Sequence, residues 1–266
     1  MARRRFGQHF LFDPNILGRI ADALGAPAGA KTLEIGPGPG GLTAVLLERG
    51  LRLTAVEKDR DLAARLRARW PDLDLVEGDA LELDWPAALG LEPGEPWYLI
   101  GNIPYNITSP LIDKALAPPR PVRVVYLVQQ EVALRLAAAP GSEAYGSLTV
   151  GVAAAARVER LFGVPSGAFR PRPKVASAVV RLTPLAEPLI LDAERVAFRR
   201  FTTGLFGARR KQLVRALRTV TGLDAAVVRQ VCARANVDSE LRPEAIDAGG
   251  LVSLFRGVVD AGWPRV

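Results

Sequence analysis

The first two-thirds of the chain alternates between short apolar runs and helix-like segments, and this pattern restricts the possible folds most. Short apolar runs that end at glycine or polar residues predict buried strands. We place these strands at residues 31–35, 53–56, 73–76, 97–100 and 122–128. Helices are predicted between them at 41–48 and 60–70, from about Ser109-Pro110, and at 130–138. Such alternation predicts an α/β domain with a parallel sheet and helices on both faces.

The remaining third has a different pattern. Residues 148–162 are ambiguous between strand and helix, and residues 176–182 alternate as a strand. Pro184 and Pro188 bracket a predicted linker. Beyond it the helical period predicts four helices, at 192–203, 209–220, 224–235 and 250–261. The sequence therefore predicts two domains, an α/β domain at 1–185 and a small helical domain at 186–266.

Composition excludes several classes of function. The chain has one cysteine, Cys232, and one histidine, His9, so neither an internal disulfide nor a zinc site with Cys and His ligands can form. The longest uncharged apolar stretch, 147–156, is too short to span a bilayer. No export signal follows the first arginines, so we expect a cytoplasmic protein without a membrane partner. The net charge of +7 fits either a polyanionic partner such as nucleic acid or a simple solubility charge.

A glycine-rich loop follows the first predicted strand. Gly36, Gly38 and Gly41 match the pattern G-x-G-x-x-G at the start of a predicted helix. Glycines at these places let the backbone approach a nucleotide-like ligand and let the helix pack on the strand. An ordinary strand-to-helix turn is the alternative explanation.

Two acidic residues end the next two predicted strands. Glu57 follows the glycine loop by about 20 residues, where a carboxylate accepts hydrogen bonds from ribose hydroxyls. Asp79 ends the third strand, where it can accept a hydrogen bond from an adenine amine. These residues fit a nicotinamide cofactor and S-adenosylmethionine equally well.

The segment Asn102-Ile103-Pro104-Tyr105 follows the fourth predicted strand. An exocyclic adenine amine is a poor nucleophile, because its lone pair is delocalised into the ring. The side-chain oxygen of Asn102 and a backbone carbonyl of Ile103 or Pro104 can accept its two hydrogens. Tyr105 can stack on the target base. These residue types favour methyl transfer to an adenine amine, and a proline turn with a capping asparagine is the alternative.

Together, these segments give the sequence a family resemblance that covers nearly the whole chain. It resembles the bacterial small-subunit (16S) rRNA adenine N6,N6-dimethyltransferases, the kasugamycin-resistance methyltransferases. The matching segments are Arg5-Phe-Gly-Gln-His-Phe-Leu11, Leu33-Glu-Ile-Gly-Pro-Gly38, Val56-Glu-Lys-Asp59, Gly78-Asp-Ala80, Gly101-Asn-Ile-Pro-Tyr105, Val128-Gln-Gln-Glu131, Ala144-Tyr-Gly146, Phe169-Arg-Pro-Arg-Pro-Lys-Val175 and Phe206-Gly-Ala-Arg-Arg-Lys211. The resemblance implies a Rossmann-like methyltransferase sheet, a small C-terminal helical domain and S-adenosylmethionine as cofactor.

The resemblance also implies site residues. The implied cofactor-binding residues are His9, Leu11, Gly36, Gly38, Glu57, Lys58, Asp79, Ala80 and Asn102. The implied catalytic residues are Asn102, Ile103, Pro104, Tyr105 and Phe169, the last as a second aromatic wall for the flipped base. The family often has asparagine where this chain has His9, so at that position we expect the backbone, rather than the side chain, to contact the cofactor. Phe169 has a core role as its alternative, and Arg170 stands where the family often has another aromatic residue.

Basic clusters predict an RNA-binding surface. The implied RNA-binding residues are Arg5, Arg172, Lys174, Arg209, Arg210 and Lys211. On a helix, Lys211, Arg215 and Arg218 fall on one face. Phosphate contacts of this kind give affinity and register. A solvated charged face is the alternative for any single cluster.

The resemblance implies dimethylation of two adjacent adenines near the 3′ end of 16S rRNA, in the assembling small subunit, by a monomeric enzyme. One alternative is a 23S rRNA adenine-N6 methyltransferase of the macrolide-resistance type. Another is a non-catalytic RNA-binding assembly factor that has kept the fold.

Overall fold

The computed structural model describes residues 9–104 and 107–264. Arg5 and Tyr105 lie outside the described residues. The chain divides into two compact units. A sheet unit holds residues up to 133 together with 158–184, and a helical unit holds 134–157 and the residues from 185 on. The predicted linker around Pro184 thus coincides with a change of unit, whereas residues 134–157 belong with the helices.

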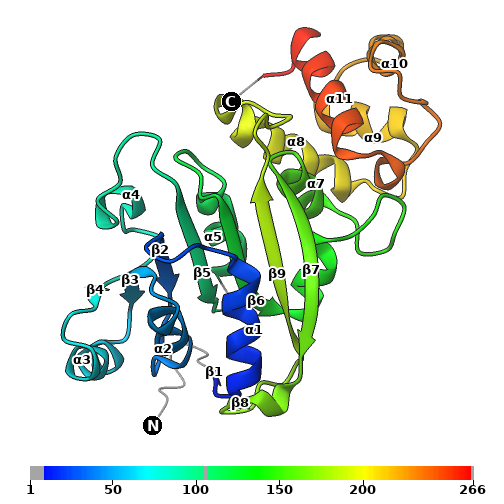
Figure 1. Cartoon of the computed structure of the whole chain (residues 1–266). Helices are drawn as coiled ribbons and strands as arrows, with labels where there is room; N and C mark the ends of the chain where they lie inside the picture. Colours follow the sequence, from blue (N-terminus) through cyan, green and yellow to red (C-terminus); the bar gives the residue numbers. More distant parts are fainter. Residues whose placement is uncertain (1–8, 105–106, 265–266) are drawn as a thin grey trace. The chain divides into compact units, whose positions relative to one another are not determined.

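The sheet unit is built on a mixed seven-stranded sheet in the order β4-β3-β2-β5-β6-β9-β7 (Figure 1). Its strands are β2 (Lys31–Ile35), β3 (Arg52–Glu57), β4 (Asp74–Glu77), β5 (Trp97–Asn102), β6 (Arg123–Gln129), β7 (Ala156–Val164) and β9 (Ser177–Pro184). The five strands from β4 to β6 are parallel, and β9 is antiparallel to β6. The predicted α/β sheet and its first five strands are therefore confirmed.

The strand order reverses direction between β2 and β5. From β2 the chain builds outward through β3 to β4, and it then returns to add β5 on the other side of β2. The register pairs Ile35 with Gly101, so the loops that leave β2 and β5 start side by side and diverge. In parallel sheets, such a switch point opens a crevice at the carboxyl ends of the strands, where ligands bind.

Helices cover both faces of the sheet. Those of the sheet unit are α1 (Pro14–Leu24), α2 (Gly41–Glu48), α3 (Arg60–Arg69), α4 (Trp85–Ala88) and α5 (Thr108–Ala115), and α6 (Gln130–Leu136) spans the change of unit. Figure 1 shows α1 across the near face of the sheet, where Leu17, Ile20 and Leu24 pack with Val125 and Leu127 of β6.

Helix α1 has clear local signals that the sequence analysis overlooked. The Asp13 carboxylate accepts hydrogen bonds from the backbone N–H groups of Asn15 (2.9 Å) and Ile16 (3.1 Å), Pro14 occupies the first turn, and Gly25 ends the helix. Helix α5 begins at Thr108, one residue before the predicted start at Ser109, and it has no side-chain cap.

A short two-stranded ribbon joins segments far apart in the sequence. β1 (Phe10–Leu11) pairs antiparallel with β8 (Phe169–Arg170), which follows the 3₁₀ turn Ser166–Ala168. Phe10 lies opposite Arg170 and Leu11 opposite Phe169.

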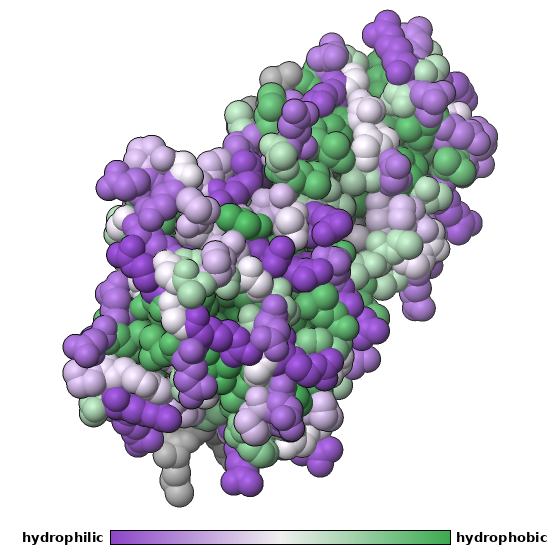
Figure 2. Space-filling model, viewed as in Figure 1, coloured by the Kyte–Doolittle hydropathy of each residue, from purple (hydrophilic) through white to green (hydrophobic). Residues whose placement is uncertain are grey.

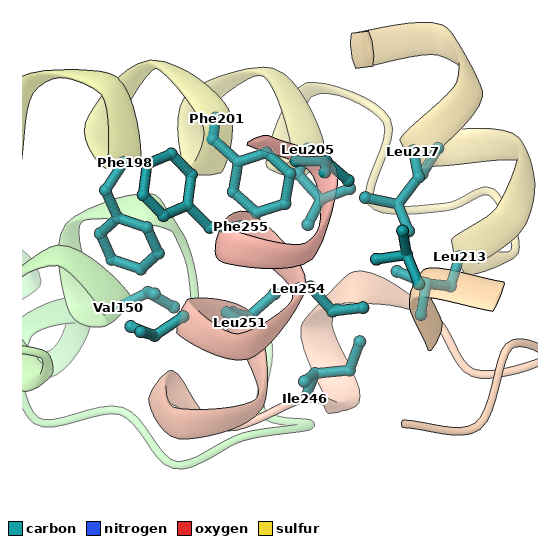
Figure 3. Close-up of a cluster of buried hydrophobic side chains, with 14 of the residues drawn as sticks. Val150, Phe198, Phe201, Leu205, Leu213, Leu217, Ile246, Leu251, Leu254 and Phe255 are labelled. Carbon is teal, nitrogen blue, oxygen red and sulfur yellow. The ribbon is translucent and has the colours of Figure 1, made fainter. Parts of the chain in front are cut away.

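The helical unit packs its own core. Its helices are α7 (Ser147–Ala153), α8 (Arg195–Gly207), α9 (Leu213–Thr221), α10 (Ala225–Arg234) and α11 (Ala248–Asp260), with 3₁₀ turns at Asp192–Glu194 and Pro243–Ala245. Figure 3 shows Phe198, Phe201 and Phe255 in one buried cluster with aliphatic side chains from α7, α9 and α11. The rings of Phe198 and Phe255 meet edge to face with centroids 5.4 Å apart, a favoured aromatic geometry.

Two sequence expectations change in this unit. The ambiguous segment 148–162 divides into α7 and the start of β7, because α7 buries Val150 in the helical core. The helix predicted from residue 209 begins only at Leu213, so Arg209, Arg210 and Lys211 lie in the preceding turn. On the face shown in Figure 2, hydrophilic side chains are spread over the surface of each unit.

Candidate active site

The glycine-rich loop leaves β2 at the switch point. Gly36 and Gly38 have φ angles of 67° and 59°, a conformation that side chains with a Cβ rarely adopt. A Cβ on Gly36 would lie 3.5 Å from the Asn102 carbonyl oxygen, and one on Gly38 would lie 2.9 Å from the Phe10 ring. The loop backbone thus lies close to the end of β5 and to Phe10 of β1.

Glu57 holds the glycine loop from the end of β3. One carboxylate oxygen accepts a hydrogen bond from the Gly38 N–H at 3.0 Å, and the other accepts from the Asp59 N–H at 2.9 Å. The residue is only 5% exposed, and burial raises the pKa of its carboxyl. Each oxygen retains a second lone pair, so the carboxylate can also accept hydrogen bonds from a ligand.

Asp79 lies just beyond β4. Its carboxylate accepts hydrogen bonds from Lys58 Nζ (2.6 Å) and from the Leu81 N–H (2.9 Å), and the bond from Lys58 holds the pKa of Asp79 below its usual value. Lys114 of α5, which the sequence analysis missed, donates to the carbonyls of Ala80, Leu81 and Leu83. Burial lowers the pKa of Lys114. Hydrogen bonds from Lys58 and Lys114 thus hold the turn that carries Asp79 and Ala80.

Asn102 is the last residue of β5. Its side-chain Nδ2 donates to the His9 carbonyl oxygen at 2.9 Å, although the two residues are 93 positions apart. The next residue, Ile103, is buried, and its N–H donates to the Leu127 carbonyl of β6. The Pro104 carbonyl accepts hydrogen bonds from the Ile107 N–H (3.1 Å) and Thr108 Oγ1 (3.4 Å).

A small cavity separates the glycine loop from β1. Its volume is about 30 Å³, enough for one water molecule, and Phe10, Leu11, Glu34, Gly36 and Asn102 are among the residues that line it. The Phe10 ring packs close to Gly38 on one side of this cavity.

Glu34 is a site residue that the sequence analysis missed. It lies in the middle of β2, is 1% exposed, and lines the cavity. Thr43 Oγ1 donates to its carboxyl at 2.7 Å. Burial, with a smaller contribution from the charge of Glu57, raises the pKa of Glu34 to about 8. The available signal was an acidic residue between two apolar residues, Leu33 and Ile35, of a strand predicted to be buried.

Strand β8 and the segment after it carry the other predicted residues of the sheet unit. Phe169 is 2% exposed and packs in the core beneath α1 and α2, so the structure places its ring among aliphatic side chains. Arg172 and Lys174 are exposed, and Arg172 Nε donates to Ser166 Oγ at 2.8 Å.

The basic residues of the helical unit differ in their surroundings. Arg209 is engaged internally, because its Nε lies 3.3 Å from a Glu244 carboxylate oxygen and its Nη1 donates to the Glu143 carbonyl. Arg210 and Lys211 are exposed. A surface hollow of about 580 Å³ is lined by Lys211, Arg215, Arg218, Thr219, Gly222 and Leu223. Lys211 therefore joins the two arginines of α9 although it lies outside that helix.

Within residues 9–104 and 107–264, no three His, Cys, Asp or Glu side chains come together as a metal ion would require. In the same ranges, every helix is too short or too polar to cross a membrane.

A match to a family model identifies the protein family of this chain. The model described as ribosomal RNA adenine dimethylase matches residues 1–246. The chain belongs to this family. It is therefore an S-adenosylmethionine-dependent methyltransferase that acts on ribosomal RNA adenines, as the resemblance predicted.

Curated members of the dimethylase family are similar over nearly their full length. The ribosomal RNA small subunit methyltransferase A of Caulobacter vibrioides is 43% identical over 264 residues, which cover 97% of this chain and 98% of that protein. The protein of the same name from Pseudomonas aeruginosa is 40% identical over 257 residues, covering 95% and 93%.

Two solved structures share the architecture. The 23S rRNA methyltransferase ErmE has a TM-score of 0.72 and 28% identity, covering 94% of this chain and 99% of that one. A dimethyladenosine transferase from Plasmodium falciparum has a TM-score of 0.79 and 24% identity, covering 96% and 99%. The second likeness shows the fold alone.

Removal of the Glu57 carboxylate is expected to weaken S-adenosylmethionine binding about 100-fold. Glu57→Ala leaves the Gly38 and Asp59 N–H groups without their acceptor, and hydrogen bonds to charged groups are worth about 1.5–3 kcal/mol each. Glu77→Ala is the matched control, since Glu77 ends the neighbouring strand but binds Arg60 and Arg67. Calorimetry gives both affinities, and an unchanged value for Glu57→Ala would refute the role.

Proposed function

We propose that this enzyme transfers methyl groups to N6 of two adjacent adenosines near the 3′ end of 16S rRNA, giving N6,N6-dimethyladenosine during small-subunit biogenesis. The names of relatives 40–44% identical support the small subunit as its target. We further propose that it works as a monomer in the cytoplasm, on the assembling particle.

The observation that carries this proposal is the position of Asn102. It ends β5 beside the glycine loop, so an amine placed at Asn102 also lies next to the predicted cofactor site. Its Nδ2 faces the His9 carbonyl, which leaves Oδ1 as an acceptor for one amine hydrogen. The Pro104 carbonyl already accepts two hydrogen bonds, which favours the Ile103 carbonyl as the second acceptor.

The cofactor supplies a methyl group on a positively charged sulfur, which is a strong electrophile. The chain needs to hold this group and the amine in line rather than to provide a general base. We propose that Gly36, Gly38 and the Leu11 backbone hold one end of the cofactor. The Glu57 and Lys58 region would hold the ribose, and Asp79 with Ala80 would hold the adenine. Tyr105 is proposed as a wall for the target base, whereas the buried position of the Phe169 ring favours a core role for that residue.

For rRNA binding, we propose the exposed cations of both units. These are Arg172 and Lys174 in the sheet unit and Arg210 and Lys211 in the helical unit, with Arg209 supporting the last two through Glu244. Arg5 is kept in this proposal from the sequence alone. In this scheme residues 1–185 catalyse the reaction and residues 186–266 contribute to binding.

Charge reversal at Arg210 and Lys211 is expected to weaken rRNA binding and to reduce the salt slope of log K by about 2, since each phosphate contact contributes roughly 0.7–0.9. The matched control reverses Arg229 and Arg234, two exposed arginines of α10. Binding measured at several salt concentrations decides the point, and equal slopes for both double variants would remove Arg210 and Lys211 from the interface.

The test of the proposed function is methyl transfer from labelled S-adenosylmethionine to purified small and large subunits from cells that lack the modification. The labelled nucleoside is then identified by mass. We expect dimethyladenosine in small-subunit RNA. Label only in large-subunit RNA would assign the enzyme to the macrolide-resistance type, which the likeness to ErmE keeps as the alternative. Cofactor binding without label on either would indicate an assembly factor.

A further inference from the structure

His9 contacts two separate parts of the site. Its ring Nδ1 lies 2.8 Å from the Pro171 carbonyl oxygen, and its own carbonyl accepts the hydrogen bond from Asn102 Nδ2. A carbonyl oxygen only accepts, so Nδ1 carries the proton in this contact. The residue thereby connects the segment after β8 with the end of β5.

The hydrogen bond to the His9 carbonyl determines how the Asn102 amide is oriented. An amide has one acceptor atom and one donor group, and only the NH₂ group can face a carbonyl oxygen. With the NH₂ group held by His9, Oδ1 is directed to the other side of the amide plane. The opposite orientation would turn N–H groups toward the N–H groups of a substrate amine, where they would repel each other.

The position of the His9 carbonyl depends on the ribbon of β1 and β8. Phe10 and Leu11 pair with Arg170 and Phe169, and the Phe12 N–H donates to the Ala168 carbonyl at 3.1 Å. The contact between the His9 ring and Pro171 continues this pairing by one more residue. It therefore acts on the same residue whose carbonyl receives Asn102.

We propose that His9 is a positioning residue for methyl transfer. Its imidazole, anchored on Pro171, holds its backbone carbonyl where that carbonyl orients the Asn102 amide, so that Oδ1 faces the target amine. This inference rests on the proposed acceptor role of Asn102. It concerns the rate of transfer, because a misdirected amide still leaves the glycine loop, Glu57 and Asp79 in place.

Three variants test the proposal. His9→Ala removes the ring donor, whereas His9→Asn places an amide N–H at the position of Nδ1. Phe12→Leu is the matched control, because it removes the stacking of Phe12 on Arg170 within the same ribbon and leaves His9 intact. We expect kcat to fall about tenfold in His9→Ala, as the loss of one neutral hydrogen bond allows. We also expect kcat within twofold of wild type in His9→Asn, which restores the ring's hydrogen bond, and in Phe12→Leu.

A spectroscopic measurement distinguishes a specific effect on the Asn102 amide from a general loss of structure. The side-chain NH₂ resonance of Asn102 is identified as the ¹⁵N–¹H signal that Asn102→Ala lacks. We expect this signal to shift in His9→Ala and to return in His9→Asn. An unshifted signal, a wild-type kcat in His9→Ala, or a failure of His9→Asn to restore kcat would each overturn the proposal. If Asn102→Ala itself kept the wild-type rate, the proposed function of Asn102 would fail instead.

Discussion

Asn102→Ala is expected to lower the rate of methyl transfer by about 100- to 1,000-fold while the protein keeps partial affinity for S-adenosylmethionine. The size is that found when one group that stabilises a transition state is removed from a preorganised site. The change deletes the acceptor that draws the amine toward a tetrahedral nitrogen. The Glu57 and Asp79 contacts on the other strands are untouched.

Single-turnover transfer to unmodified small subunits, together with calorimetric cofactor binding, measures this effect. Asn15→Ala is the matched control, because Asn15 is an exposed asparagine at the start of α1. We expect Asn15→Ala to behave as wild type. A rate for Asn102→Ala equal to that of Asn15→Ala would remove Asn102 from the reaction, and complete loss of cofactor binding would assign it a binding role only.

Glu34→Gln is expected to abolish a large pH dependence of stability in the cofactor-free protein. The pKa of Glu34 is about 8 in the folded chain, against 4.5 when the residue is exposed by unfolding. Below pH 4.5 Glu34 is protonated in both the folded and the unfolded chain, so its ionisation does not change the free energy of unfolding. Between pH 4.5 and 8 only the unfolded state releases the proton, so stability is lost as the pH rises. At roughly 1.4 kcal/mol per pKa unit, the loss is on the order of 5 kcal/mol.

Glutamine keeps the oxygen that accepts from Thr43 but has no proton to release. We therefore expect Glu34→Gln to match wild type near pH 4 and to be the more stable protein near pH 9. Urea unfolding at a series of pH values measures the difference, which also cancels the titration of all other groups. Glu48→Gln, at an exposed glutamate of α2, should follow wild type throughout. A gap between Glu34→Gln and wild type that stayed constant with pH would contradict the assignment.

The sequence by itself determined the strands, most of the helices and the places of the candidate motifs. Apolar runs, capping residues and glycine-rich turns act locally, so their periods and order indicate the elements without any tertiary information. The parallel sheet follows from the alternation, and a parallel sheet brings the carboxyl ends of its strands to one edge. For this reason Gly36, Glu57, Asp79 and Asn102 could be predicted to share that edge before any contact was known.

Only the tertiary structure decided which partners these side chains have. Asn102 donates a hydrogen bond to His9, and Glu57 accepts one from Gly38. Lys114 donates to the turn after Asp79. The two residues of each contact are 19 to 93 positions apart in the sequence. The same holds where the sequence was ambiguous or misleading. Residues 148–162 form a helix and then a strand, because α7 packs in the helical core. Arg209 lies outside the helix predicted for it and forms an ion pair with Glu244. Local propensity carries no information about such distant partners. Burial by the surrounding structure raises the pKa of Glu34, and a hydrogen bond to His9 orients the Asn102 amide.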